Sequence, residues 1–114
     1  MGATADVRRE TLSDAAAWKA LALSFPCIAG MVVGERIPAD FTAETLQAKR
    51  YRSGIDLCGI STAERSVCAF LLHVWNKYDN AFELPELQDW DERHLLAFAA
   101  WVDGRTLGRP LRYF

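Results

Sequence analysis

A cysteine and a histidine lie five residues apart in the apolar segment STAERSVCAFLLHVWNKYDN, residues 61–80. Cys68 and His73 are the residue types of a nucleophile and its general base, in which an imidazole accepts the thiol proton. On one α-helix, however, positions five apart are separated by about 140° around the axis, so these two side chains cannot meet. Apolar surroundings also raise the pKa of a thiol and leave it unreactive. We therefore expect both residues to belong to the core, and we predict no catalytic residue.

The spacings that are typical of metal sites and of other active sites are missing from the sequence. Its cysteines and histidines form no CxxC, HxxxH or HExxH pattern. The sequence also has no P-loop, no GxGxxG phosphate-binding loop and no GxSxG nucleophile elbow. We therefore predict no metal site, no cofactor and no enzyme activity. An enzyme with an unrecognised site near Cys58, His73 or His94 is the third and weakest hypothesis.

The segment that carries Cys68 and His73 is the clearest predicted element. Ser61-Thr62-Ala63-Glu64 has the pattern of a capping box, which opens a helix. No charged residue follows between Arg65 and Lys77. A helix that is apolar around its whole circumference is a buried one. We predict a central, buried helix over residues 62–76.

Other segments carry weaker helix signals. Residues 27–38 are too short for periodicity to separate a strand from a helix or irregular structure, and we leave this open. Valine, isoleucine and threonine are too scattered to predict a sheet. We predict an all-α fold, a compact bundle of four to five short helices around the central one. The predicted outer elements are residues 12–25, residues 43–52 after Thr42 as N-cap, a helical turn near Pro85, and a helix from the capping-box pattern at Asp89–Glu92 to about Val102, ended by Gly104.

The length of 114 residues corresponds to one domain. We expect residues 11–104 to form the helical domain, residues 1–10 to be loosely ordered, and residues 105–114 to be a basic, extended C-terminal tail. Gly108 and Pro110 prevent a regular helix in this tail, which then packs on its own core or on a neighbouring molecule.

Composition and net charge give expectations about the location and the partners of the protein. The net charge is −2, and three cysteines occur without a secretory signal or a membrane-length apolar run. These features predict reduced thiols, a cytoplasmic location and no membrane partner. The hydrophobic fraction of 51% and four tryptophans favour self-association or a protein-binding surface. We expect a homo-oligomer.

The distribution of charge gives the best indication of function. Six acids and no lysine or arginine occur from Asp79 to Glu92, interleaved with aromatic residues. Helix-dipole effects explain the acids next to the last helix but not those nearer to Asp79. Aromatic side chains within a charged rim are typical of protein-binding surfaces. The predicted partner-binding residues are Tyr78, Asp79, Phe82, Glu83, Glu86 and Trp90, with Arg109, Arg112 and Phe114 of the tail as a second contact.

A basic cluster provides the alternative. The helix over residues 43–52 ends in LQAKRYR, and Gln47, Lys49, Arg50 and Arg52 are the residue types that contact phosphates and base edges. The negative net charge and the lack of a preceding helix-turn pattern count against this reading. We predict a protein-binding module, such as an adaptor, inhibitor or regulatory subunit. A small DNA- or RNA-binding regulator is the alternative.

Overall fold

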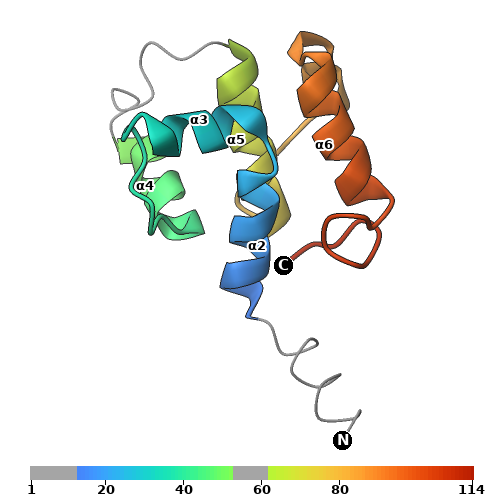
Figure 1. The fold of residues 1–114 in the computed structure, drawn as a ribbon, viewed down its shortest axis with the longest axis horizontal. Coiled ribbons are helices and arrows are strands. Elements are labelled where there is room, and N and C mark those ends of the chain that lie inside the picture. The colour runs from blue at the N-terminus through green and yellow to red at the C-terminus, as the bar shows by residue number, and fades with distance from the viewer. Residues whose placement is uncertain (1–12, 53–61) are drawn as a thin grey trace, which may run out of the picture.

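A computed structural model describes residues 13–52 and 62–114, with the backbone alone for residues 48–52, 62 and 63. The described residues form five α-helices and one 3-10 helix and contain no strand, which confirms the predicted all-α fold (Figure 1). In chain order these are α2 (Asp14–Leu23), α3 (Pro26–Val33), α4 (Ala43–Arg52), α5 (Thr62–Trp75), η1 (Leu84–Asp89) and α6 (Glu92–Val102).

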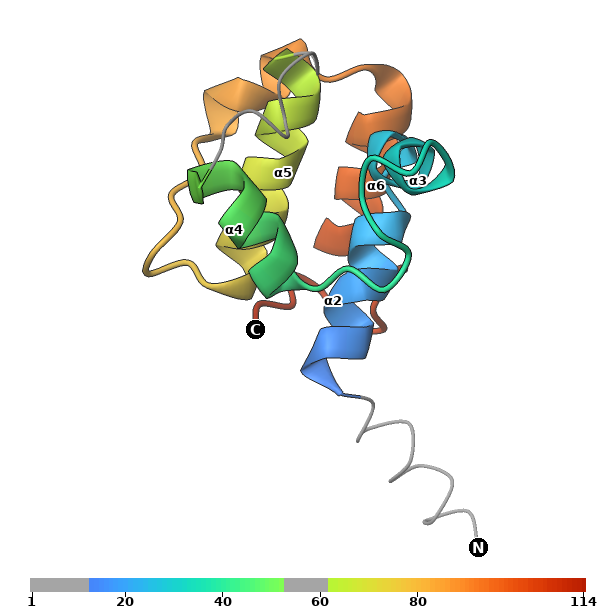
Figure 2. The same cartoon turned by 90° about the vertical axis from the view of Figure 1, so that its left-hand side faces the viewer.

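The central helix lies where the sequence predicted it. In Figure 1, α4 and α6 lie on opposite sides of α5, and the turned view in Figure 2 separates α2 from α5. Helices α2, α4 and η1 all pack against α5. From Ser66 to Leu72 every residue of α5 is buried. Burial on all sides explains why this helix carries no charge in its interior.

The undecided segment after Pro26 is helical. Proline lacks the N–H that an α-helix interior needs but is well accommodated in the first turn, and here Pro26 begins α3. Ile28 and Met31 of this helix are buried, whereas Val33 is 85% exposed. The axes of α2 and α3 differ in direction by 94°. Among the described helices, none is by itself long and apolar enough to cross a membrane; only this bent pair, taken together, meets that criterion.

Side-chain caps fix most of the helix starts. The hydroxyl of Ser13 accepts from the N–H of Ala16 at the start of α2. The hydroxyl of Thr42 accepts from the N–H of Thr45, which confirms Thr42 as the predicted N-cap of α4. The capping box predicted at Ser61 lies outside the described residues.

The cap of the last helix differs from the prediction. The sequence pattern placed it at Asp89, but Asp89 is the final residue of η1. The chain then runs extended through Trp90, and the N-cap of α6 is Asp91, whose carboxylate accepts from the N–H of His94 at 3.0 Å. Burial of Trp90 determines the residue at which α6 begins. The local pattern of acidic residues does not predict this burial.

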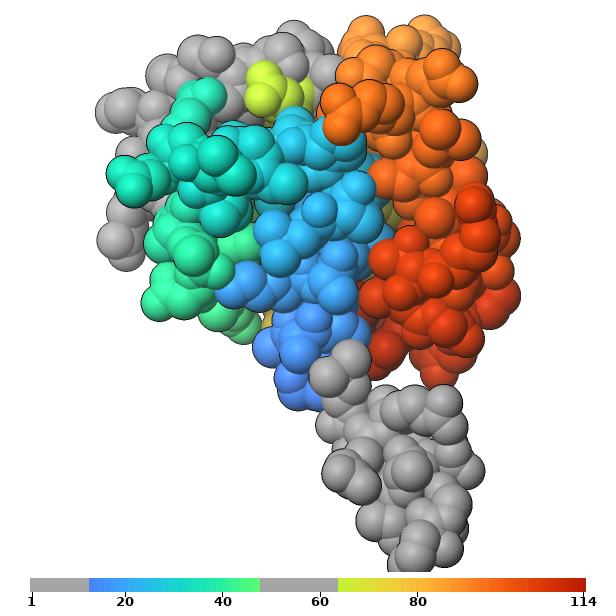
Figure 3. Space-filling model, viewed as in Figure 1, coloured from blue at the N-terminus to red at the C-terminus, as the bar shows by residue number. Residues whose placement is uncertain are grey.

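The C-terminal segment is a series of turns that returns to the core, and it is not extended as predicted. Gly104 ends α6 with φ of +88°, and a Cβ at this position would lie 2.9 Å from the backbone nitrogen of Pro110. Only glycine fits this reversal without strain. The N–H of Phe114 then donates to the carbonyl of Val74 at 3.0 Å. The tail therefore packs on its own domain, and Figure 3 shows it beside α2.

The ring of Phe70 lies at the centre of the core. Five aromatic rings surround it, with centroids 5.1–5.9 Å away, mostly in edge-to-face arrangements: Phe25, Phe82, Trp90, Phe98 and Trp101. Such pairs add about 0.5–1.5 kcal/mol each beyond burial of their area.

We predict that Phe70→Ala lowers the free energy of unfolding by about 3–5 kcal/mol, because it removes the shared partner of five rings and leaves a cavity. Chemical denaturation monitored by circular dichroism measures this change. Tyr78→Ala is the control, since this aromatic ring is 89% exposed and its loss should cost less than about 0.5 kcal/mol. Equal stability of the two variants would contradict the placement of Phe70.

Candidate functional site

Cys68 belongs to the core, as predicted, whereas His73 lies at its edge. Cys68 is buried, and His73 is half-buried. The Nδ1 atom of His73 lies 2.8 Å from the carbonyl oxygen of Asn80, and its Nε2 lies 2.9 Å from the hydroxyl of Tyr113. Since a carbonyl only accepts, Nδ1 carries the proton and Nε2 accepts from Tyr113. Both ring nitrogens are thus occupied within the fold, and burial raises the pKa of the Tyr113 hydroxyl.

The same polar network includes Gln47, which the nucleic-acid hypothesis assigned to base contacts. The side-chain amides of Gln47 and Asn80 exchange two hydrogen bonds, at 3.0 and 3.1 Å. Asn80 is 1% exposed, so this pair satisfies polar atoms that would otherwise be buried without partners. The amide of Gln47 is thus engaged within the fold, and its predicted contact with nucleic acid stays a prediction. The side chains of Lys49, Arg50 and Arg52 lie outside the described residues, so their role stays a prediction.

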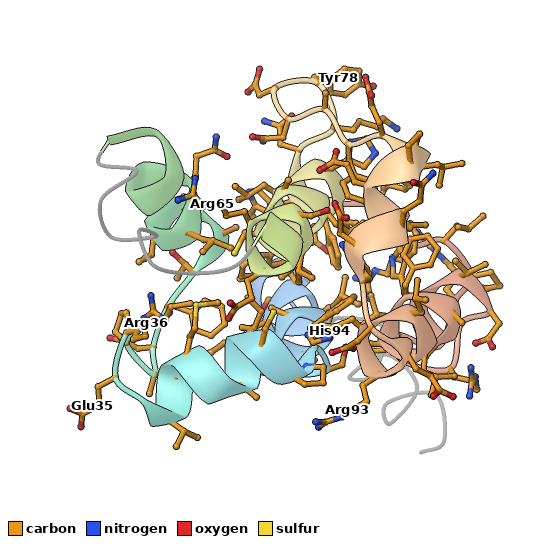
Figure 4. All side chains as sticks on the ribbon, turned by 90° about the horizontal axis from the view of Figure 1, so that it is seen from above. Glu35, Arg36, Arg65, Tyr78, Arg93 and His94 are labelled. Atoms are coloured by element: carbon orange, nitrogen blue, oxygen red, sulfur yellow. The ribbon has the colours of Figure 1, made fainter. Side chains whose placement is uncertain are left out.

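A second histidine forms a contact that sequence analysis missed. His94 of α6 lies at the junction with α3 (Figure 4). Its Nδ1 is 2.7 Å from a carboxylate oxygen of Asp91, and its Nε2 accepts from the backbone N–H of Cys27 at 3.1 Å. That N–H belongs to the first turn of α3, where no side chain of α3 itself supplies an N-cap hydrogen bond. The imidazole therefore caps a neighbouring helix.

This arrangement of acid, histidine and cysteine is not a catalytic triad. The backbone N–H of Cys27, and not its thiol, donates to the imidazole. Burial, with a smaller contribution from neighbouring Cys68, raises the pKa of the Cys27 thiol to about 12. The thiol is then protonated near neutral pH and is a poor nucleophile. The i, i+3 spacing of Asp91 and His94 is a usual capping spacing, so only the tertiary structure shows the contact with α3.

The predicted acidic-aromatic segment divides into an inner and an outer set of side chains. Trp90 is 5% exposed, and its indole N–H donates to the hydroxyl of Ser66 at 3.0 Å. Phe82 is half-buried against Phe70. Trp90 is therefore not available as the surface anchor that the sequence suggested, whereas Phe82 keeps part of its ring exposed at the edge of the ring cluster. Tyr78 is the exposed aromatic residue of this segment.

The acids of the segment remain on the outside. Asp79, Glu83, Asp89, Asp91 and Glu92 are exposed, and Glu86 is half-buried. The carboxylate of Glu86 accepts from the N–H of Glu83 at 3.1 Å, which fixes the start of η1. Within the described part of the chain, no lysine or arginine forms a salt bridge with any acid of this segment.

Most of the predicted contact residues of the C-terminal tail form contacts within the molecule. Arg112 pairs with Asp14 at 3.2 Å, and its guanidinium lies 4.8 Å from the ring centroid of Phe114. Phe114 is half-buried, with its ring 5.9 Å from that of Trp75. As a second partner surface, the tail therefore retains only Arg109 as an exposed member of the predicted set.

Comparisons with protein-family models, with curated proteins and with solved structures find no match for this chain. Among the described residues, no three His, Cys, Asp or Glu side chains are arranged to hold a metal ion. Any indication of function therefore comes from the exposed side chains of the protein.

The contact between Asp91 and His94 predicts a pH dependence. Hydrogen bonds from the His94 side chain and backbone lower the pKa of Asp91 in the folded protein. A lowered native pKa stabilises the fold at pH values above the unfolded-state pKa of about 3.9, and this contribution is lost as the pH falls through the native pKa. We predict that Asp91→Asn lowers the free energy of unfolding at pH 7 and that the difference from the wild type disappears as the pH falls through the lowered native pKa of Asp91.

Urea denaturation at a series of pH values measures this difference. Asp89→Asn is the matched control, since it removes an exposed carboxylate two residues away for which no hydrogen bond to a described side chain is observed. The same pH dependence in both variants would contradict a specific contribution from the Asp91–His94 contact.

Proposed function

We propose that the protein is a non-enzymatic binding module for another protein and that η1, with the turns on either side of it, is the contact surface. The observation that supports this most directly is the exposure of Leu84, which is 69% accessible at the start of η1. Glu83 and Glu86 flank it along the chain, and neither they nor Asp89 and Glu92 form a salt bridge with a described lysine or arginine. We call Leu84, Glu83, Asp89 and Glu92 the acidic surface.

The composition of this surface indicates the chemistry of the partner. Burying an exposed leucine in an interface favours binding, by roughly 25 cal/mol per Å² of apolar area removed from water. Carboxylates around it accelerate association with a positively charged protein and repel a negatively charged one. The matching partner has lysine or arginine side chains around an apolar recess. A nucleic acid would be repelled by the same carboxylates.

The loss of binding on substitution is the test of this proposal. The double variant Leu84→Ser, Asp89→Lys removes the apolar group and reverses one charge on the same short helix. We avoid Glu83 and Glu86, because their hydrogen bond positions η1 itself. We expect the wild-type protein to retain a stoichiometric protein from an extract of its source organism, after nuclease treatment and at moderate salt. The double variant should bind this partner at least about tenfold more weakly.

Val33→Ser, Glu35→Lys is the matched control. Val33 is 85% exposed at the end of α3, and Glu35 is an exposed acid two residues later, so the control makes the same chemical changes on another surface. It should bind the partner normally. Equal binding by both double variants, or retention that disappears with nuclease, would contradict the acidic surface as the contact site. Sedimentation of the purified protein would show whether the partner is a second copy.

A further inference from the structure

A pocket of about 440 Å³ lies at the end of α5, away from the acids of η1. Three segments form it: the end of α5 with the following turn, the start of α2, and the C-terminal residues. This volume falls in the range of small-molecule sites, about 300–1,000 Å³. The side chains that matter for its chemistry are Asp14, Trp75, Lys77, Tyr78, Tyr113 and Phe114.

Aromatic rings supply the apolar part of this pocket. The rings of Trp75 and Phe114 are 5.9 Å apart and inclined by 32°. Tyr113 is held by its hydrogen bond to His73. These three rings are half-buried and so present partly exposed surface to the pocket. Such surfaces favour a flat, apolar group, which stacks on rings or meets their edges.

Two charged side chains line the pocket, Asp14 and Lys77. Asp14 is already paired with Arg112, at 3.2 Å. The Nζ atom of Lys77 forms no salt bridge within the described part of the chain. It lies 5.2 Å from the ring centroid of Tyr113 and 5.5 Å from that of Tyr78. An anion is the complement of this ammonium group.

Trp75 supplies a second hydrogen-bond donor. The indole N–H groups of the other tryptophans donate to acceptors in the protein: Trp18 to Leu71, Trp90 to Ser66 and Trp101 to Arg112. The N–H of Trp75 has no such acceptor among the described residues. A lysine and an indole N–H are both donors, and a carboxylate only accepts.

We infer that this pocket binds a small organic anion that consists of a flat apolar ring system and a carboxylate. The ring system packs against Trp75, Tyr113 and Phe114, and the carboxylate accepts hydrogen bonds from Lys77. This site is separate from the acidic surface and does not depend on the protein-binding proposal.

Three probes of one shape separate charge from ring packing: 2-naphthoate, its neutral amide and the cationic 2-naphthylmethylammonium. We expect 2-naphthoate to bind the full chain with a dissociation constant of about 0.1–1 mM, the amide about three- to tenfold more weakly, and the cation most weakly. Calorimetric titration measures these constants. In ¹H–¹⁵N NMR spectra the indole N–H signal of Trp75 should shift, while that of Trp90, buried in the core, should not.

Lys77→Gln should weaken 2-naphthoate to the level of the amide. Lys19→Gln is the matched control, because Lys19 also lies over an aromatic ring, Phe41, at 5.0 Å, but does not line the pocket. It should leave the affinity unchanged. Should Lys77→Gln fail to fold, the three probes on the wild-type protein still decide the question. Equal affinities for acid and amide, no binding of the acid, or a shift confined to other indoles would overturn the proposal.

Discussion

The packing of aromatic rings around Phe70 is the constraint on which the rest of this structure depends. Its partners come from three parts of the chain: the α2–α3 junction, the segment around η1, and α6. Edge-to-face contacts restrict orientation as well as distance, so one central ring fixes how these elements approach α5. The position of Trp90 in this cluster sets where η1 ends and α6 begins. The core therefore determines which acids of this segment point outward.

A network of hydrogen bonds around Asn80 also holds the elements together. Burying Asn80 requires partners for its amide and carbonyl, and Gln47 and His73 provide them. His73 in turn holds Tyr113. These hydrogen bonds join α4, α5 and the C-terminal segment, so they connect parts of the chain that are far apart in the sequence. Histidine and glutamine often suggest a functional site in a sequence. In this fold, His73 and Gln47 instead form hydrogen bonds with buried polar groups.

The limits of prediction follow from which contacts are local. The bounds of α4 and α5, and the cap at Thr42, depend on residues within a few positions of one another, and the sequence predicted them closely. Trp90 was predicted to be exposed because acids flank it, whereas its burial depends on Phe70, twenty positions earlier. The capping of α3 by His94 spans 67 positions and leaves no local pattern. The role of the acidic residues in binding stays a prediction.

Both proposed surfaces depend on how the chain leaves α5. The side-chain oxygen of Asn76 accepts from the N–H groups of Tyr78 and Asp79, at 3.2 and 3.3 Å, and its amide donates to the carboxylate of Asp79. This turn holds Lys77 and Tyr78 over the pocket and starts the chain toward η1. Because the turn begins at the end of the most buried helix, exposed charges here are positioned by a rigid support. The side chains of the proposed anion pocket, Trp75, Lys77 and Tyr78, therefore come directly before the exposed acids of the proposed protein-binding surface along the chain.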